Sequence, residues 1–187
     1  GNLTIATALN VTFQNELAVT GAFVQTDGGN TTRFEGVTTA TSISVRAAQQ
    51  VFAGSTIRAT TGDLGIESDE IDFFGGTNSV QGSAQLVLRP YQSATTIDVG
   101  SPTPTGLLDI SDVDINALQD GFAQIIIGRV EDGTGAMLIG SSTFRDNVAF
   151  HAGSITVESN TLVGQVLSSQ ESIEMTARSG GIITNDD

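Results

Sequence analysis

Residues 31–59 read TTRFEGVTTATSISVRAAQQVFAGSTIRA, and this stretch contains the pattern that decides the fold. Short runs in which β-branched residues alternate with small or polar ones are separated by turn residues such as glycine and serine. Alternation over four to six residues predicts β-strands rather than helices. Similar runs recur along the chain, among them DEIDFF, AQLVLR, TTIDVG, QIIIG, AMLIG and SITVES. The sequence therefore predicts an all-β protein.

A phenylalanine recurs at a nearly fixed interval. Phe13, Phe34, Phe52 and Phe74 are 21, 18 and 22 residues apart, and each is followed two positions later by Asn or Gly. Phe144 begins a similar phrase, and 162–166 repeats it 18 residues later. A period near 20 is typical of a solenoid, because one coil cannot bury its inner face without neighbours above and below. The pattern predicts a parallel β-helix in which Phe34, Phe52 and Phe74 are buried at one position of successive coils.

A β-sandwich is the alternative, since its strands also follow one another at short intervals. Sandwich turns do not place phenylalanine at one phase of a 20-residue unit, so we favour the solenoid. We expect a single β-solenoid domain over residues 1–187. The three prolines, Pro90, Pro102 and Pro104, fall within about 90–121. Because proline cannot donate to a sheet ladder, we expect an insertion or side element there.

Residues 111–122, SDVDINALQDGF, raise the question of a calcium loop. Asp112, Asp114 and Asn116 match the first three ligand positions of an EF-hand, but the required glycine and the bidentate glutamate are both replaced by alanine. A short helix near 111–120 explains the same residues. Ser111 is a good N-cap, Asp114 completes a pair resembling a capping box, and Ile110 with Ile115 forms a hydrophobic staple. We therefore predict a helix here and no metal site.

Other polar residues give weak signals for chemistry. His151 is the one histidine and has no cysteine or second histidine to accompany it. Asp69, Glu70 and Asp72 form the densest acidic cluster, but carboxylate catalysis needs groups that converge on one face. The glycine-rich phrases 26–30 and 131–135 are interpreted as turns. Three Asn-x-Thr sequons begin at Asn2, Asn10 and Asn30. We predict no catalytic, cofactor-binding or metal-binding residue and no enzymatic activity, with calcium as the one ion left open.

Charge restricts the partners. Acids outnumber bases 21 to 7, which gives a net charge of −14, and every base is arginine. Such a surface repels nucleic acids and anionic membranes. No apolar run reaches the 18 residues of a transmembrane helix, and the opening GNLTIATALN lacks the features of a signal peptide. Cysteine is absent, so no disulfide contributes to stability. We expect neither nucleic-acid binding nor membrane insertion.

Two longer phrases carry a family resemblance. LVLRPYQSATTIDVG (86–100) and the run that begins GLLDISDVDINALQDGFAQIIIG (from 106) resemble a segment of very large surface exoproteins, especially cyanobacterial ones, related to filamentous haemagglutinin. The resemblance covers about residues 30–165. It implies a right-handed parallel β-helix, location outside the cell or at its surface, and roles in adhesion, filaments or matrix. It supplies no catalytic residues.

These observations give two functional hypotheses. The first is a non-enzymatic structural module of an extracellular adhesin, filament or surface matrix, which meets other copies or adjoining modules end to end. Its open end coils would invite strand pairing. The second is an extracellular module that binds carbohydrate, such as surface glycans, or calcium on its acidic face.

Overall fold

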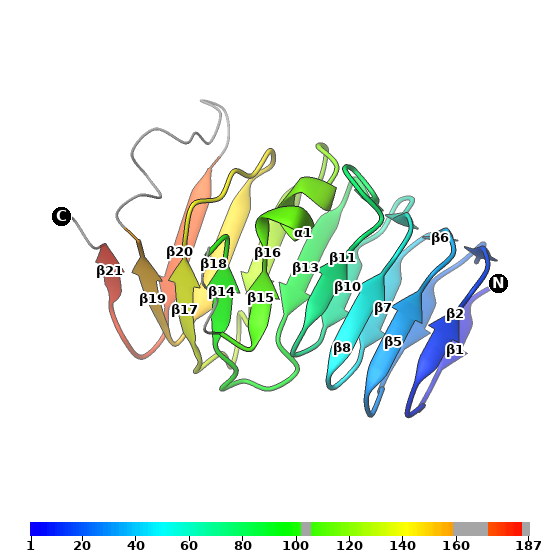
Figure 1. Ribbon diagram of the computed structural model, residues 1–187, viewed down its shortest axis with the longest axis horizontal. Helices are drawn as coiled ribbons and strands as arrows, with labels where there is room; N and C mark the ends of the chain where they lie inside the picture. The colour runs from blue at the N-terminus through cyan, green and yellow to red at the C-terminus, as the bar shows by residue number, and fades with distance from the viewer. Residues whose placement is uncertain (102–105, 159–171, 185–187) are drawn as a thin grey trace.

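The computed structural model describes residues 1–101, 106–158 and 172–184, and these form a β-solenoid of about eight turns (Figure 1). Strands account for 47% of the chain and helix for 4%. The predicted all-β parallel β-helix with one short helix is confirmed. Pro102, Pro104 and the repeat at 162–166 lie outside the described residues.

The first four coils each contribute three strands, which pair in parallel with the corresponding strands of the next coil. Hydrogen-bonded partners in neighbouring coils are 20 to 22 residues apart. The strands of these coils, in chain order, are β1 (Leu3–Ile5), β2 (Val11–Phe13), β3 (Leu17–Ala18), β4 (Phe23–Gln25), β5 (Thr31–Phe34), β6 (Thr38–Ala40), β7 (Ile43–Arg46), β8 (Gln50–Ala53), β9 (Ile57–Ala59), β10 (Leu64–Glu67), β11 (Ile71–Phe73) and β12 (Val80–Gln81).

The later coils are built differently, with two strands each. Their elements are β13 (Gln85–Arg89), β14 (Ile97–Val99), β15 (Leu108–Ile110), α1 (Asp112–Ala117), β16 (Gln124–Gly128), β17 (Ala136–Ile139), β18 (Val148–Ala152), β19 (Ser154–Val157), β20 (Ile173–Ala177) and β21 (Ile182–Thr184). One eight-stranded sheet, β1-β4-β7-β10-β13-β16-β18-β20, runs the whole length of the stack. The other faces are two four-stranded sheets in the first half and one five-stranded sheet in the second.

The core is a set of columns in which one apolar residue lies above another. In the eight-stranded sheet, Leu3, Phe23, Ile43 and Leu64 are paired in successive strands. Phe23, Ile43 and Leu64 are at most 1% exposed. Strand residues between these positions face outward, which explains the alternation seen in the sequence. Pairing and packing therefore repeat together, coil after coil.

The phenylalanine column continues only in part. Phe13 pairs with Phe34 and stacks on it at 5.4 Å, as the repeat predicts. The prediction is wrong for Phe52, because Phe34 pairs with Ala53 and Phe52 is one residue out of register. A slip of one residue turns a strand side chain to the opposite face. Phe52 instead faces outward beneath Arg33, with 4.0 Å from the guanidinium carbon to the ring centroid.

Phe74 is also outside the column. It lies one residue past the end of β11, is 59% exposed, and packs against Phe52 at 5.5 Å. Phe73, its neighbour in sequence, pairs with Ala53 and is fully buried. The buried positions of these two coils are thus Ala53 and Phe73, where the sequence interpretation placed Phe52 and Phe74.

The proline-containing segment is part of the coil stack, which corrects the expected side element. Strands β14 and β15 pair with each other and belong to the five-stranded sheet. The chain steps backwards here, since β15 follows β14 in sequence but lies beside β11, towards the N-terminal coils. Helix α1 packs next to β11, and Leu118 forms a bridge with Val80. This segment converts three-strand coils into two-strand coils.

The local structure of α1 is the predicted one. The Ser111 side chain accepts from the backbone of Asp114, and the Asp114 side chain accepts from the backbone of Ser111, which completes a capping box. Ile110 and Ile115 are both buried, as the staple requires. The helix ends at Ala117, before the expected Gly121.

The register makes a prediction about Phe73 and Phe52. Phe73→Ala should lower the free energy of unfolding by about 3–5 kcal/mol, because it empties a filled core position. Phe52→Ala removes a side chain from the outer face and should cost on the order of 1 kcal/mol or less. Urea unfolding followed by circular dichroism would measure both. Equal losses would contradict the assigned register.

Candidate functional site

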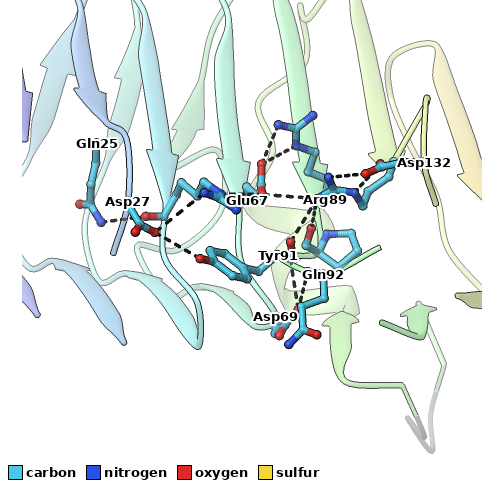
Figure 2. Close-up of polar contacts among 11 residues, drawn as sticks. Gln25, Asp27, Glu67, Asp69, Arg89, Tyr91, Gln92 and Asp132 are labelled. Carbon is cyan, nitrogen blue, oxygen red and sulfur yellow. Dashed lines mark hydrogen bonds and ion pairs between the residues drawn. The ribbon is translucent and has the colours of Figure 1, made fainter. Parts of the chain in front are cut away.

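Three arginines converge on one glutamate at the outer face of the eight-stranded sheet. Arg46, Glu67 and Arg89 are neighbours in register in β7, β10 and β13. Arg46 Nε donates to Glu67 Oε1 at 2.8 Å, and Arg89 Nε donates to Oε2 at 2.9 Å. Arg129, which follows β16, donates from Nη1 to Oε1 at 3.3 Å. Figure 2 shows Glu67 held between these guanidinium groups.

Glu67 is only 7% exposed, and its environment keeps it charged. Burial opposes ionisation, but the hydrogen bonds and positive charges of Arg46 and Arg89 outweigh it and lower the pKa of Glu67. Removing a charge from water is costly unless hydrogen bonds and opposite charges replace the solvent. Here both carboxylate oxygens have such partners.

The chain that leaves β13 folds back against this cluster. Arg129 Nη1 also donates to the carbonyl oxygens of Pro90 at 2.9 Å and Tyr91 at 3.2 Å. The Tyr91 ring lies 4.3 Å from the guanidinium carbon of Arg46, and its hydroxyl donates to Asp27 at 3.2 Å. Residues far apart in sequence are thereby fixed to one another across several coils (Figure 2).

A groove of about 380 Å³ lies beside the arginines and crosses β4, β7, β10 and β13. Outward positions that are neighbours in register form its floor: Val24, Ser44, Gly65 and Val87. The charged residues that line it are Arg46, Arg89 and Glu67. Two positive charges and one negative give the lining +1, whereas the whole chain carries −14.

Sequence reasoning missed this site. Its signal was nevertheless present, because Arg46 and Glu67 are 21 residues apart and Glu67 and Arg89 are 22 apart. Opposite charges separated by one coil length predict a ladder of ion pairs across parallel strands. Arg129 lies beyond the irregular segment, so no spacing could have revealed it.

The predicted acidic cluster is divided between two environments. Asp69 Oδ1 accepts hydrogen bonds from Tyr91 N, Gln92 N and Thr95 Oγ1, which anchors the segment after β13. Asp72 accepts from Gln50 at 2.6 Å. Asp69 is therefore a structural anchor, and the three acids do not form one site.

Several carboxylates gather where β11, β15 and β14 meet. Burial, with the nearby charge of Asp72, raises the pKa of Glu70 to about 7. Asp109 is next to Asp98 in register, and burial together with those two acids raises the pKa of Asp109. Burial also raises the pKa of Asp114 to about 6, against the hydrogen bonds from Ser111 and Phe73 that favour its charged form. The folded protein therefore holds these carboxyl groups in surroundings that favour the protonated form.

The EF-hand-like residues have structural partners. Asp114 Oδ1 accepts from Phe73 N at 2.7 Å, and Oδ2 accepts from Ser111 N at 2.9 Å. Asp112 and Asn116 are exposed on α1. Among the described residues, no group of three or more His, Asp or Glu is arranged to hold a metal ion.

His151 lies in β18 and is partly buried. Burial is the main reason that the pKa of His151 is lowered, although the charge of Glu174 opposes this. Its Nδ1 has no hydrogen-bond partner in the described part of the chain. No arrangement with a nucleophile surrounds it, so it adds nothing to a catalytic interpretation.

The two glycine-rich phrases place acids beside arginines. Asp27, in 26–30, lies 3.9 Å from Arg46 Nη1, and Asp132, in 131–135, accepts from Arg129 Nε at 2.7 Å. The sequon residues Asn2 and Asn10 use their side-chain oxygens to accept from the next coil, at Ala22 N and Thr31 N respectively. Glycosylation at Asn2, Asn10 and Asn30 stays a prediction.

The outermost described coils expose part of the core. Leu3, Ile5, Phe13, Leu17 and Val19 in the first coil are only partly buried, and so are Ile173, Met175 and Ala177 in the last. Strands β1, β2 and β3 each lie at the edge of a sheet, as do β20 and β21. Both ends therefore present open strand edges together with apolar side chains.

Comparisons with models of protein families, with curated proteins and with solved structures found no match for this chain. The β-solenoid architecture is shown, and the resemblance to surface exoproteins stays a prediction. In the described ranges, no helix has the length and apolar character needed to cross a membrane.

The Glu67 cluster makes a prediction about stability. Glu67→Gln should lower the free energy of unfolding at neutral pH by about 1.5–3 kcal/mol, because three guanidinium groups lose their shared anionic partner. Since the folded protein lowers the pKa of Glu67, its contribution is complete above 4.5, the ordinary value, and is lost as pH falls below it. Urea midpoints of both proteins should therefore converge in acid. A pH-independent difference would contradict the charged role of Glu67.

Glu70 gives the opposite pH dependence. Because its pKa rises from 4.5 to about 7 on folding, its contribution is present below 4.5 and is lost as pH rises through about 7. Between pH 5 and 8 the wild-type protein should lose stability, and Glu70→Gln should reduce that loss. Glu16→Gln, at an exposed position, is the matched control. Thermal unfolding across this pH range tests the effect, and identical profiles for all three proteins would refute it.

Proposed function

We propose that the protein is a non-enzymatic structural module of an extracellular or cell-surface adhesin, filament or matrix, stacking end to end with other copies or adjoining modules. The observation that supports this proposal is the state of the end coils. Their strand edges are open and their core side chains are partly exposed.

The comparison within one column is the clearest support. Leu3, Phe23 and Ile43 occupy equivalent positions in the first three strands of the eight-stranded sheet. Phe23 and Ile43 are 0% and 1% exposed, whereas Leu3 is only partly buried. A further coil on the outer side of β1 would bury Leu3 in the way that β4 and β7 bury Phe23. Burial of apolar area would drive such stacking.

Strand polarity determines the geometry of the contact. All described strand pairs are parallel, so a copy that continues the ladder adds its last coil to the first coil of the next. Such a head-to-tail contact uses two different surfaces, and unless its rotation closes a ring it builds a filament. An open strand edge is a known template for pairing with another chain.

The polar residues also support a structural role. Asp69 and Asp114, which the sequence offered as candidate chemical groups, are committed to hydrogen bonds that fix neighbouring coils and α1. Three arginines neutralise Glu67. Their observed partners hold coils together, which is the task of a rigid module.

Salt should control the assembly. With −14 charges per chain, copies repel one another, and the Debye length falls from about 10 Å at 0.1 M salt to about 3 Å at 1 M. Multi-angle light scattering and electron microscopy across protein and salt concentrations should show larger, elongated species as salt rises. Protein that stays monomeric under every condition would overturn the proposal.

Leu17→Arg tests whether the N-terminal edge makes the contact. Leu17 packs partly against the core of the first coil, and a charge there should abolish association. Leu107→Arg adds the same charge at a position that is already 58% exposed, and it should associate like wild type. Circular dichroism must show that both variants fold. Equal loss of assembly in both would contradict an edge-specific contact, and sensitivity to a chelator would favour calcium binding instead.

A further inference from the structure

A glycine keeps the sheet groove open. Gly65 lies inside β10, which pairs in unbroken register with β7 and β13. A Cβ atom at this position would meet nothing closer than the carbonyl oxygen of Ile43, at 4.0 Å. Neither a bulge nor close backbone packing requires glycine there. Glycine inside a strand lowers stability, and it often marks a place where a ligand approaches the backbone.

The surroundings of Gly65 form a shallow floor with a polar rim. Val24 and Val87 give the floor apolar surface on either side, and Ser44 adds a hydroxyl group between them. Arg46, Glu67 and Arg89 line one side. The site thus combines a flat, partly apolar floor with hydrogen-bond donors along one edge, which is the usual character of a small-ligand site.

The two arginines are held ready to bind an anion. Their side chains are 41% and 46% exposed, while their Nε groups are fixed by Glu67. Within the described residues, Nη2 of Arg46 and Nη1 of Arg89 have no bonding partner. A guanidinium fixed in place loses little conformational freedom on binding, and its planar N–H groups match a carboxylate.

The fold favours a saccharide over a peptide in this groove. The backbone groups of β7 and β10 are already used by parallel ladders on both sides. An acidic peptide therefore cannot add to them as another strand, which is the usual source of peptide affinity at a sheet. A sugar ring needs no backbone partner, because it can lie on the apolar floor and direct its hydroxyl groups to Ser44 and the rim.

We propose that the groove over Gly65 binds a carboxylated saccharide, with the carboxylate at the free N–H groups of Arg46 and Arg89 and a sugar ring over Gly65. The +1 charge of the lining, within a chain of −14, favours one acidic group at this position. This site lies on the outer face of the stack and does not depend on end-to-end assembly.

Trigalacturonate is the probe for the test, with neutral galactotriose and triglutamate as comparison ligands. Isothermal titration calorimetry at low salt should give saturable binding of trigalacturonate to the intact protein, at least tenfold tighter than that of either comparison ligand. No saturable binding at millimolar trigalacturonate would overturn the proposal. Equal affinity for galactotriose would overturn the role of the arginines, and tighter binding of triglutamate would overturn the choice of a saccharide.

Two variants locate the binding site. Gly65→Leu fills the groove while leaving the arginines in place, and Arg89→Gln removes one guanidinium while leaving the floor intact. Each should weaken trigalacturonate binding at least tenfold. Thr12→Leu, at an exposed position of β2, and Arg33→Gln, on the face formed by β5, are the matched controls and should bind like wild type. Circular dichroism confirms folding, and unchanged affinity in Gly65→Leu would place the ligand elsewhere and refute the proposal.

Discussion

The register between neighbouring coils is the constraint on which the rest of this structure depends. Each coil places an apolar side chain on that of the coil before it, and the same alignment closes the parallel ladders of hydrogen bonds. The column of Leu3, Phe23, Ile43 and Leu64 illustrates this double requirement. Because side chains alternate between faces, a shift of one residue would expose the core and bury the polar face. The same alignment brings Arg46, Glu67 and Arg89 together on the outside.

The sequence was sufficient for the architecture and for the helix. A solenoid could be inferred because period-two alternation and a repeat near 20 residues agree with each other. The capping box at Ser111 and Asp114 could be identified because it is local, needing only residues three positions apart. Features that follow from nearest neighbours or from a strict repeat were thus accessible without a structure.

Features that depend on the length of individual turns were not accessible in this way. Phe52 was misplaced because one residue fewer separates it from Phe34 than separates the paired Ala53, and only the ladder reveals which of the two faces inward. The backward step from β14 to β15 was missed because it brings residues near 110 beside β11, a contact with no signature in local sequence. Arg129 reaches Glu67 only after this step has been made.

The backward step divides the stack into two halves that share a single continuous sheet. On that one side, eight strands form an unbroken spine, while on the other faces three-strand coils change to two-strand coils around α1. Coils within each half contact chiefly their immediate neighbours, so each half can form or melt as a cooperative unit. The joint has no such repeat and is closed by contacts distant in sequence, such as Phe73 N to Asp114 Oδ1, across 41 residues. Under a stretching force along the stack, we infer that the joint opens on the face opposite the spine, so that the rod bends there before either half unravels.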